Sequence, residues 1–255
     1  MIDIHSHILP GIDDGARTVQ DSIDMARKAV SEGIHTIIAT PHHMNGKYQN
    51  TKSDILLLVD HVNEALKMEN ISLEVLPGQE CRIYGEILED YQKGEILTLN
   101  QDSQYLFIEF PSNSVPRYAE RLLYDIQVEG LIPVIVHPER NAELIERPEK
   151  LYRLVKNGAA TQLTASSLVG YFGKNIQKFS QQIIEANLTH FIASDAHNIN
   201  NRSFKMEEAM NYIEKKYGID SVYYFTENAE LLVGNKTIYK EIPEQIKKKK
   251  FLGIF

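Results

Sequence analysis

Cysteine is almost absent from this sequence of 255 residues. Cys81 is the only one, so an intramolecular disulfide is excluded and nothing points to an oxidising compartment. The first residues contain no basic stretch followed by an apolar core, and no apolar run approaches the length of about 18 residues that a membrane helix needs. We therefore expect a cytoplasmic protein that is not inserted into a membrane.

Positive charge is also in short supply. Lys and Arg together number 27 against 35 Asp and Glu, which gives a formal net charge of -8 at pH 7. This acidic balance argues against a broad nucleic-acid-binding surface, whereas divalent cations held in a cleft would reverse the local sign. We expect no nucleic-acid partner.

The length and the hydrophobic content of 43% allow one large core, so we expect a single domain over residues 1–255. Within it, residues 241–255 read as a C-terminal tail in which four lysines at 247–250 precede an apolar end. We expect a solvated lysine run followed by a docked apolar terminus, and we assign the tail no function.

Apolar runs of strand length alternate with helical patterns along most of the chain. The expected strands cover residues 1–7, 35–40, 72–76, 105–109, 131–137, 159–163 and 189–194, and the expected helices 18–33, 53–68, 85–93, 117–129, 148–157 and 175–186. Such alternation predicts parallel strands joined by right-handed crossovers. We predict an α/β fold, a distorted (β/α) barrel of about seven parallel strands with further helices outside it from residue 202 onward. An open doubly wound sheet is the alternative.

The first strand ends in two histidines, His5 and His7. In an extended strand, side chains at i and i+2 leave the same side of the backbone, so the two imidazoles can grip one metal ion. Alone, such a pair is weak evidence, because histidines at a strand end are more often solvated. Asp195 and His197 repeat the same spacing at the end of the last strand.

Other expected strands also end at an acid or a histidine. In a parallel barrel these ends converge on one mouth, which would hold five of the nine histidines. The candidate metal ligands are His5, His7, Asp14, His42, Glu80, Glu109, His137, Asp195 and His197. Because three such ligands hold one ordinary divalent ion, nine suggest two or three ions, with a carboxylate such as Glu80 bridging. Ligands without thiolates suit manganese, iron, zinc or magnesium.

Six short runs carry a resemblance to a known family. They are Asp-Ile-His-Ser-His at 3–7, Pro-Gly-Ile-Asp-Asp-Gly at 10–15, Thr-Pro-His at 40–42, Gly-Gln-Glu at 78–80, His-Pro-Glu-Arg at 137–140 and Ser-Asp-Ala-His at 194–197. In this order they resemble the polymerase-and-histidinol-phosphatase (PHP) superfamily, and more closely the bacterial PHP-type protein-tyrosine phosphatases of the CpsB/YwqE kind. The resemblance spans residue 1 to about residue 202.

The resemblance implies a PHP-type barrel with a trinuclear site, for which we expect manganese first. The implied ligand groups are His5, His7, Glu80 and Asp195 on one ion, Glu80, Glu109 and His137 on the second, and Asp14, His42 and His197 on the third. It also implies phosphate contacts from Arg140 and Arg202. The implied substrate is phosphotyrosine on a bacterial tyrosine kinase that controls capsule or exopolysaccharide synthesis.

Clustered cations would neutralise the phosphoryl oxygens and activate a bridging hydroxide for in-line attack. Arg140 presents a planar fork of donors just beyond His137, and Arg202 and Arg17 are weaker candidates for the same role. A phenol leaves with a pKa of about 10, so a dedicated general acid is not required. His43 could serve as one, but we read it as an ordinary hydrogen-bonded histidine.

A cysteine phosphatase needs a Cys-x5-Arg loop, yet the sixth residue after Cys81 is Ile87. A thiolate route is therefore not expected. Three alternatives stay open at this point: a PHP phosphatase for a small phosphomonoester such as histidinol phosphate, a nuclease-like phosphoesterase, and a non-catalytic metal-binding regulator of a kinase.

Overall fold

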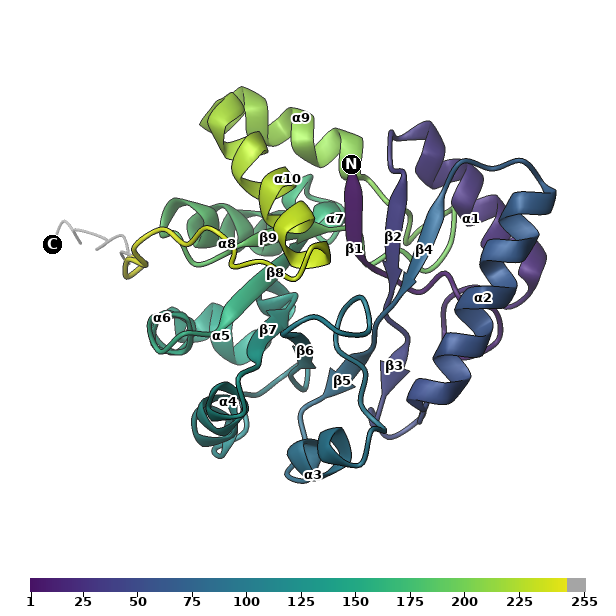
Figure 1. Cartoon of the computed structure of the whole chain (residues 1–255). Helices are drawn as coiled ribbons and strands as arrows, with labels where there is room; N and C mark the ends of the chain where they lie inside the picture. Colours follow the sequence, from purple (N-terminus) through teal and green to yellow (C-terminus); the bar gives the residue numbers. More distant parts are fainter. Residues whose placement is uncertain (247–255) are drawn as a thin grey trace, which may run out of the picture.

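The computed structural model describes residues 1–246 (Figure 1). Residues 247–255, which include the predicted lysine run and apolar end, lie outside the described residues. The first part of the expected tail has no regular secondary structure, and Glu244 N donates to Ala186 O at 2.8 Å. Within residues 1–246, no helix is both long and apolar enough to cross a membrane.

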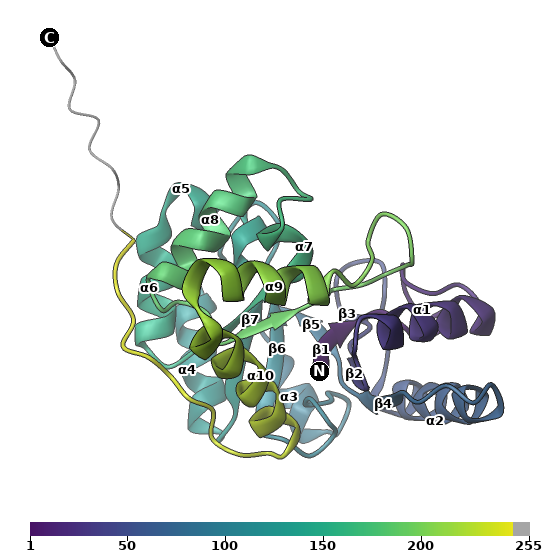
Figure 2. The ribbon, with the colours of Figure 1, turned by 90° about the horizontal axis from the view of Figure 1, so that it is seen from above.

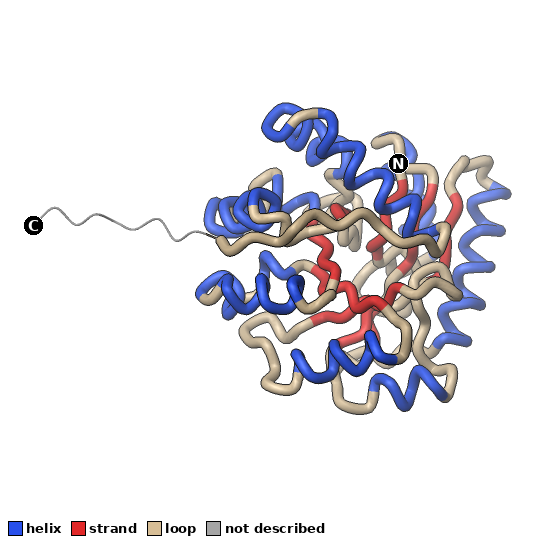
Figure 3. The backbone as a smooth tube through the Cα atoms, turned by 60° about the vertical axis from the view of Figure 1, so that its left-hand side comes forward, coloured by secondary structure: helices blue, strands red, loops and turns tan. Residues whose placement is uncertain are grey.

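In the part of the chain that the structure describes, nine short strands form the centre, with the helices around them (Figure 3). They are β1 (Ile2–Ser6), β2 (Thr36–Ala39), β3 (His42–His43), β4 (Glu74–Pro77), β5 (Glu80–Arg82), β6 (Tyr105–Glu109), β7 (Ile132–Val136), β8 (Ala160–Thr164) and β9 (Phe191–Ala193). All pair in parallel, in the orders β1-β2-β4 and β3-β5-β6-β7-β8-β9. The predicted class, a parallel α/β fold, is confirmed.

The two sheets arise because two of the predicted strands are bent. Thr40 and Pro41 separate β2 from β3, and proline has no N–H to donate to a ladder. Gly78 and Gln79 separate β4 from β5, and a Cβ on Gly78 would lie 2.7 Å from Ile38 Cγ2, closer than atoms can pack. Nine strands therefore correspond to seven segments of chain.

Contacts between β1 and β9 complete the ring of segments. Asp195 N donates to His5 O at 2.9 Å, and His7 N donates to Ala196 O at 2.8 Å. These bonds extend past the ends of both strands, so the first and last segments lie side by side. The arrangement is a distorted ring of parallel strands rather than a regular barrel.

Helices cover the outside of this ring. They are α1 (Val19–Ser31), α2 (Lys52–Met68), α3 (Ile87–Gln92), α4 (Ala119–Val128), α5 (Ala142–Glu146), α6 (Pro148–Lys156), α7 (Ala165–Leu168), α8 (Lys174–Glu185), α9 (Met206–Tyr217) and α10 (Ile219–Val233), with the 3-10 turn η1 (Pro138–Arg140). Helices α1 and α2 lie together beside β2 and β4 (Figure 2). Helices α9 and α10 pack on each other, as expected for added outer helices. The short α5, α7 and η1 were not predicted.

The apolar residues fall into two clusters, on the two faces of the strands. Along β6, Tyr105 and Phe107 belong to one cluster, whereas Leu106 and Ile108 belong to the other. This alternation follows from the two-residue period of a strand. The Phe107 cluster draws residues from β1, β2, β7, β8 and β9 as well, so it fills the ring and supports the polar strand ends above it.

Candidate metal centre

His5 and His7 lie at and just beyond the end of β1. Their side chains are fully buried, and their ring centroids are 5.5 Å apart. The ring of His5 also packs on Phe107 at 5.1 Å between centroids. The i, i+2 spacing thus places both imidazoles on the same side of the strand, against the apolar filling of the ring.

The carboxylate of Glu80 lies among four histidines. Its Oε2 atom is 3.6 Å from His5 Nε2 and 3.4 Å from His7 Nε2. The same oxygen is 2.8 Å from His42 Nδ1, while Oε1 is 2.7 Å from His137 Nε2. His42 and Glu80 are register partners in the β3–β5 pair, so the sheet itself sets this meeting. The predicted central carboxylate therefore stands at the centre of the cluster.

Two of the candidate residues have a left-handed backbone. His137 has φ 36° and Asp195 has φ 52°, conformations that are uncommon outside glycine. Each directly follows or lies just past a strand, and the turn directs the side chain inward. Asp195 Oδ1 lies 3.5 Å from His5 Nε2 and 3.3 Å from His7 Nε2. The left-handed backbone of His137 and Asp195 is strained, and strain of this kind accumulates at functional sites.

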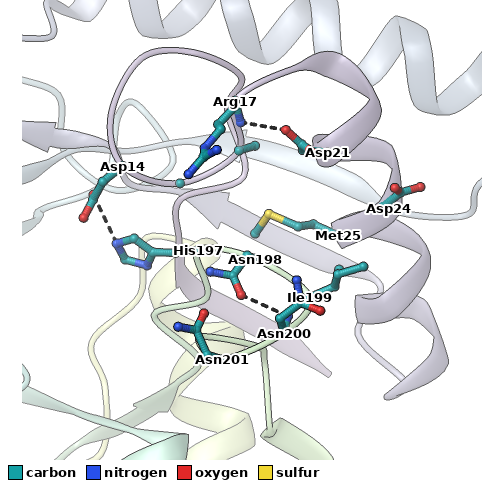
Figure 4. A pocket seen from close by; sticks show the side chains of 12 residues that line it. Asp14, Arg17, Asp21, Asp24, Met25, His197, Asn198, Ile199, Asn200 and Asn201 are labelled. Carbon is teal, nitrogen blue, oxygen red and sulfur yellow. Dashed lines mark hydrogen bonds and ion pairs between the residues drawn. The ribbon is translucent and has the colours of Figure 1, made fainter.

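Asp14 approaches the cluster from the first loop. Its Oδ1 atom lies 3.3 Å from His42 Nε2 and 3.3 Å from His197 Nε2, and Figure 4 shows it pointing toward His197. The next residue must be glycine, because a Cβ on Gly15 would lie 2.0 Å from His7 O. The tight fit of this loop against the first strand places the aspartate.

All nine predicted residues thus meet at the strand ends. Three sets have ligand atoms within 4.8 Å of one another, namely His7, Asp14, His42 and His197; His5, His7 and Glu80; and His42, Glu80 and Glu109. These sets overlap the three implied by the resemblance but are not identical to them. His7 joins the Asp14 set, and His42 rather than His137 groups with Glu109.

The electrostatics of the cluster shift the pKa values of neighbouring groups in opposite directions. Burial would lower the pKa of His42, but the charge of Glu80 and hydrogen bonds to carboxylates raise it to about 10. Burial and the nearby charge of Glu80 raise the pKa of Glu109 to about 7. Burial and the charge of Arg140 lower the pKa of His137 to about 4. Opposed shifts of this size in a cleft are typical of functional sites.

Two arginines border the cluster. Arg140 Nη2 lies 2.6 Å from Asp195 Oδ2, and Arg202 Nη2 lies 3.2 Å from the same oxygen. Both line a cavity of about 340 Å³ that also exposes His42 and His137. The third candidate, Arg17, instead lines a separate cavity of about 420 Å³ together with Asp14 and His197 (Figure 4).

This chain is similar to known proteins in sequence and in fold. The family of capsular polysaccharide synthesis proteins, CpsB/CapC, matches residues 1–234. The chain belongs to the CpsB/CapC family. It is 54% identical to the tyrosine-protein phosphatase YwqE of Bacillus subtilis and 40% identical to the putative tyrosine-protein phosphatase CapC of Staphylococcus aureus, over the full length of each pair.

Solved structures agree with this membership. A chain from the crystal structures of YwqE from Bacillus subtilis and CpsB from Streptococcus pneumoniae, described as unique metal-dependent tyrosine phosphatases, is 54% identical. The match has a TM-score of 0.95 and covers 97% of this chain and 100% of that one. An organophosphorus hydrolase from Deinococcus radiodurans, 12% identical with a TM-score of 0.56 over 91% of both chains, shares the fold alone.

This CpsB/CapC chain contains partners of the candidate ligands that the sequence did not reveal. Asp13 Oδ2 lies 2.6 Å from His7 Nδ1 and accepts the His42 backbone N–H at 3.1 Å. Gln162 Oε1 lies 2.9 Å from His5 Nδ1. Arg82 pairs with Glu109 at 3.0 Å. In the sequence, the one sign of these partners was Gln162, a polar amide within an expected strand. No pattern in the sequence distinguished the role of Asp13 from that of Asp14.

Unpartnered atoms show that the cluster suits metal ions. Among the described residues, several buried side-chain atoms in it make no hydrogen bond of good geometry, although Glu80 Oε2 lies 2.8 Å from His42 Nδ1 and Glu109 Oε2 3.0 Å from Arg82 Nε: His5 Nε2, His7 Nε2, His42 Nδ1, Glu80 Oε2, Glu109 Oε2 and His197 Nε2. Buried polar atoms are normally satisfied, so their concentration here calls for a ligand. Nitrogen and carboxylate donors together fit divalent transition metals, and the YwqE and CpsB structures are described as those of metal-dependent phosphatases.

Two residues set aside in the sequence lie in ordinary surroundings. Cys81 is fully buried, its Sγ lies 3.3 Å from Gln79 Oε1, and burial raises the pKa of its thiol. A buried thiol with a raised pKa is a poor nucleophile. His43 is also buried, with Nδ1 2.8 Å from Asn50 O, in agreement with its interpretation as a hydrogen-bonded histidine.

Proposed function

We propose that this protein is a metal-dependent phosphatase that hydrolyses phosphotyrosine in proteins. The observation that carries the proposal is the convergence of nine candidate ligands with nitrogen and oxygen donors, and of two arginines, at one end of the strand ring. The relatives named as tyrosine-protein phosphatases support it, because they match this chain over its full length.

Two or three ions would be held by the cluster, with Glu80 shared between them. His5, His7 and Asp195 would complete one site, Glu109 and His137 a second, and Asp14, His42 and His197 a third. When bound, divalent ions neutralise phosphoryl oxygens and lower the pKa of water at the centre. We propose manganese as the native metal, with iron, zinc and magnesium as alternatives.

Arg140 and Arg202 would bind the phosphoryl group. Their guanidinium groups now contact Asp195, and both border the cavity through which a substrate must enter. A planar guanidinium matches two phosphoryl oxygens at once, which orients the ester for in-line displacement. A departing phenolate, with a pKa of about 10, needs little protonation. The chain therefore requires no general acid for this leaving group.

The proposed partner is a bacterial tyrosine kinase that bears phosphotyrosine and acts in capsule or exopolysaccharide synthesis, in the cytoplasm. The family description and the name of the relative CapC support the link to capsular polysaccharide. The acidic balance of the chain argues against a nucleic-acid substrate.

A comparison of substrates tests this proposal. Manganese-loaded protein is given a phosphotyrosine peptide or histidinol phosphate, and kcat/KM is measured for each. We expect the peptide to be preferred by a factor of at least about ten, because an aryl leaving group departs more readily than an alkoxide. A preference for histidinol phosphate would replace the proposal by a small-metabolite phosphatase, and binding without turnover of either would replace it by a regulator.

A further inference from the structure

The cavity lined by Arg140 and Arg202 also has an apolar wall, whose residues take no part in the chemistry described so far. Its lining includes candidate metal ligands and the side chains of Arg140 and Arg202. The apolar wall consists of the lining residues Phe110, Val136, Pro138 and Phe172, and Ser112 and Asn141 also line the cavity. Its volume of about 340 Å³ lies in the range of pockets for small ligands.

Phe172 is the aromatic ring of this wall that remains partly exposed. It lies in the connection between α7 and α8, between Gly170 with φ 88° and Gly173 with φ 94°. These left-handed conformations favour glycine. The connection is also tied down, because Tyr171 N donates to Ser166 O at 2.9 Å and Gly173 N to Gly170 O at 3.0 Å. The backbone therefore fixes where the ring stands.

The ring of Phe172 is adjacent to the proposed phosphate-binding group. Its centroid lies 5.5 Å from Arg140 Cζ, within the range of a cation–π contact. A phosphoryl group bound by Arg140 would thus have its ester substituent beside Phe172. Phe110, which is almost fully buried, belongs to the same apolar wall.

We infer that Phe172 is a specificity-determining residue, whose ring contacts the aromatic leaving group and so selects aryl over alkyl phosphomonoesters. This inference rests on the proposed phosphatase function. An aryl substituent gains an aromatic pair with Phe172 in addition to apolar burial, whereas an alkyl substituent of the size of serine reaches neither. The selection is made by the protein wall and not only by the intrinsic reactivity of the leaving group.

Ligand binding separates this role from an effect on Arg140. Manganese-loaded full chain is titrated calorimetrically with phenylphosphonate and with inorganic phosphate, in the wild type, Phe172→Leu and Phe172→Tyr. We expect Phe172→Leu to weaken phenylphosphonate about fivefold and phosphate less than about twofold, and Phe172→Tyr to restore the difference. Equal weakening of both ligands, or no change in either, would overturn the inference.

Kinetics on paired substrates provide the second readout. The ratio of kcat/KM for phosphotyrosine and phosphoserine in the same peptide should fall about fivefold in Phe172→Leu, mainly through KM. Tyr171→Leu is the matched control, because Tyr171 is the exposed neighbour in the same connection and should leave the ratio unchanged. An unchanged ratio in Phe172→Leu would overturn the aromatic subsite alone. A wild-type protein that does not hydrolyse phosphotyrosine would instead overturn the proposed function.

Discussion

At the scale of single residues, the candidate metal centre depends on side chains that hold the ligands as much as on the ligands themselves. Asp13 contacts His7 through one oxygen and the backbone of His42 through the same oxygen, while its other oxygen accepts Gly15 N at 2.9 Å. A carboxylate behind a histidine fixes which ring nitrogen carries the proton. His7 would then present Nε2 to a metal ion.

Replacing Asp13 by asparagine should weaken metal binding. We expect the affinity for manganese to fall about 10- to 100-fold, because the charge that fixes the His7 ring is lost. Activity at saturating manganese should fall much less. The matched control is Asp60→Asn, an exposed position on α2. Unchanged manganese affinity in Asp13→Asn, measured by titration of the chelated protein, would show that this aspartate has no positioning role.

Arg140 offers a test of phosphate recognition. Arg140→Lys keeps the positive charge but loses the planar fork, so we expect kcat/KM for a phosphotyrosine peptide to fall about 100-fold. Arg153→Lys is the control, since Arg153 is exposed on α6 and pairs with Glu120. If Arg140→Lys retained wild-type kcat/KM, a bidentate contact with the phosphoryl group would be ruled out.

At the scale of elements, the bends between β2 and β3 and between β4 and β5 bring distant segments into one register. The close approach at Gly78 is a packing requirement, with Ile38 Cγ2 and Leu99 Cδ2 at 2.7 and 3.0 Å from the position of a Cβ. An added methyl group must displace buried side chains from both segments. The bend therefore couples the core to the carboxylate of Glu80, two residues later.

Gly78→Ala should destabilise the fold. We expect the free energy of unfolding to fall by about 1–3 kcal/mol, the usual cost of overpacking a core. Gly85→Ala is the control, because a Cβ on Gly85 meets no atom within 4 Å, and it should change stability by less than about 0.5 kcal/mol. Urea denaturation of both variants measures the difference. Equal stabilities would contradict the packing account of this bend.

The sequence predicted the helices and strands better than it predicted the contacts between distant segments. Alternation of strands and helices predicted the class, and the helix expected from residue 18 begins there, where the side chain of Thr18 caps α1 by accepting Asp21 N at 3.2 Å. Local periodicity contains no information on register between distant segments. For this reason the contact of Gln162 with His5, 157 residues apart, and the split of the ring into two sheets could not be predicted.

At the scale of the whole molecule, the ring has an apolar interior and a polar end. The buried Phe107 cluster packs against His5, while the first loop supplies Asp14, the 3-10 turn η1 supplies Arg140, and the segment between β9 and α9 supplies Arg202. The nine candidate ligands come from segments spread between residues 5 and 197. The proposed sites that contain His5, His7 or His197 join the first and last segments, so they require the closed ring, whereas Glu80, Glu109 and His137 come from the neighbouring segments β5, β6 and β7.

Acid should destabilise the folded chain partly through His190, which is remote in function from the proposed metal centre. Burial, assisted by the charge of Lys240, lowers the pKa of His190 to about 3, below its ordinary value of about 6.5. Between these two pKa values, His190 is therefore protonated in the unfolded state and neutral in the folded state. The contribution of His190 to the free energy of unfolding is fully present above about pH 6.5 and is lost as the pH falls toward about 3.

His190→Asn removes this titration and keeps an acceptor for Thr161 N, which now bonds His190 Nδ1 at 3.2 Å. Between about pH 6 and 4, the unfolding free energy of the wild type should fall more steeply than that of the variant, by about 1 kcal/mol per pH unit. Urea denaturation of chelated protein at each pH measures both slopes. Parallel slopes would show that His190 does not contribute to acid sensitivity.

The central claim is that phosphotyrosine hydrolysis depends on metal ions at the strand ends and not on Cys81. The most direct measurement is phosphate release from a phosphotyrosine peptide by chelated protein, before and after manganese is added back, with iodoacetamide present throughout. We predict no release before addition and full recovery after it. Activity that survives chelation, activity lost to iodoacetamide, or silence of folded, manganese-loaded protein would contradict the claim.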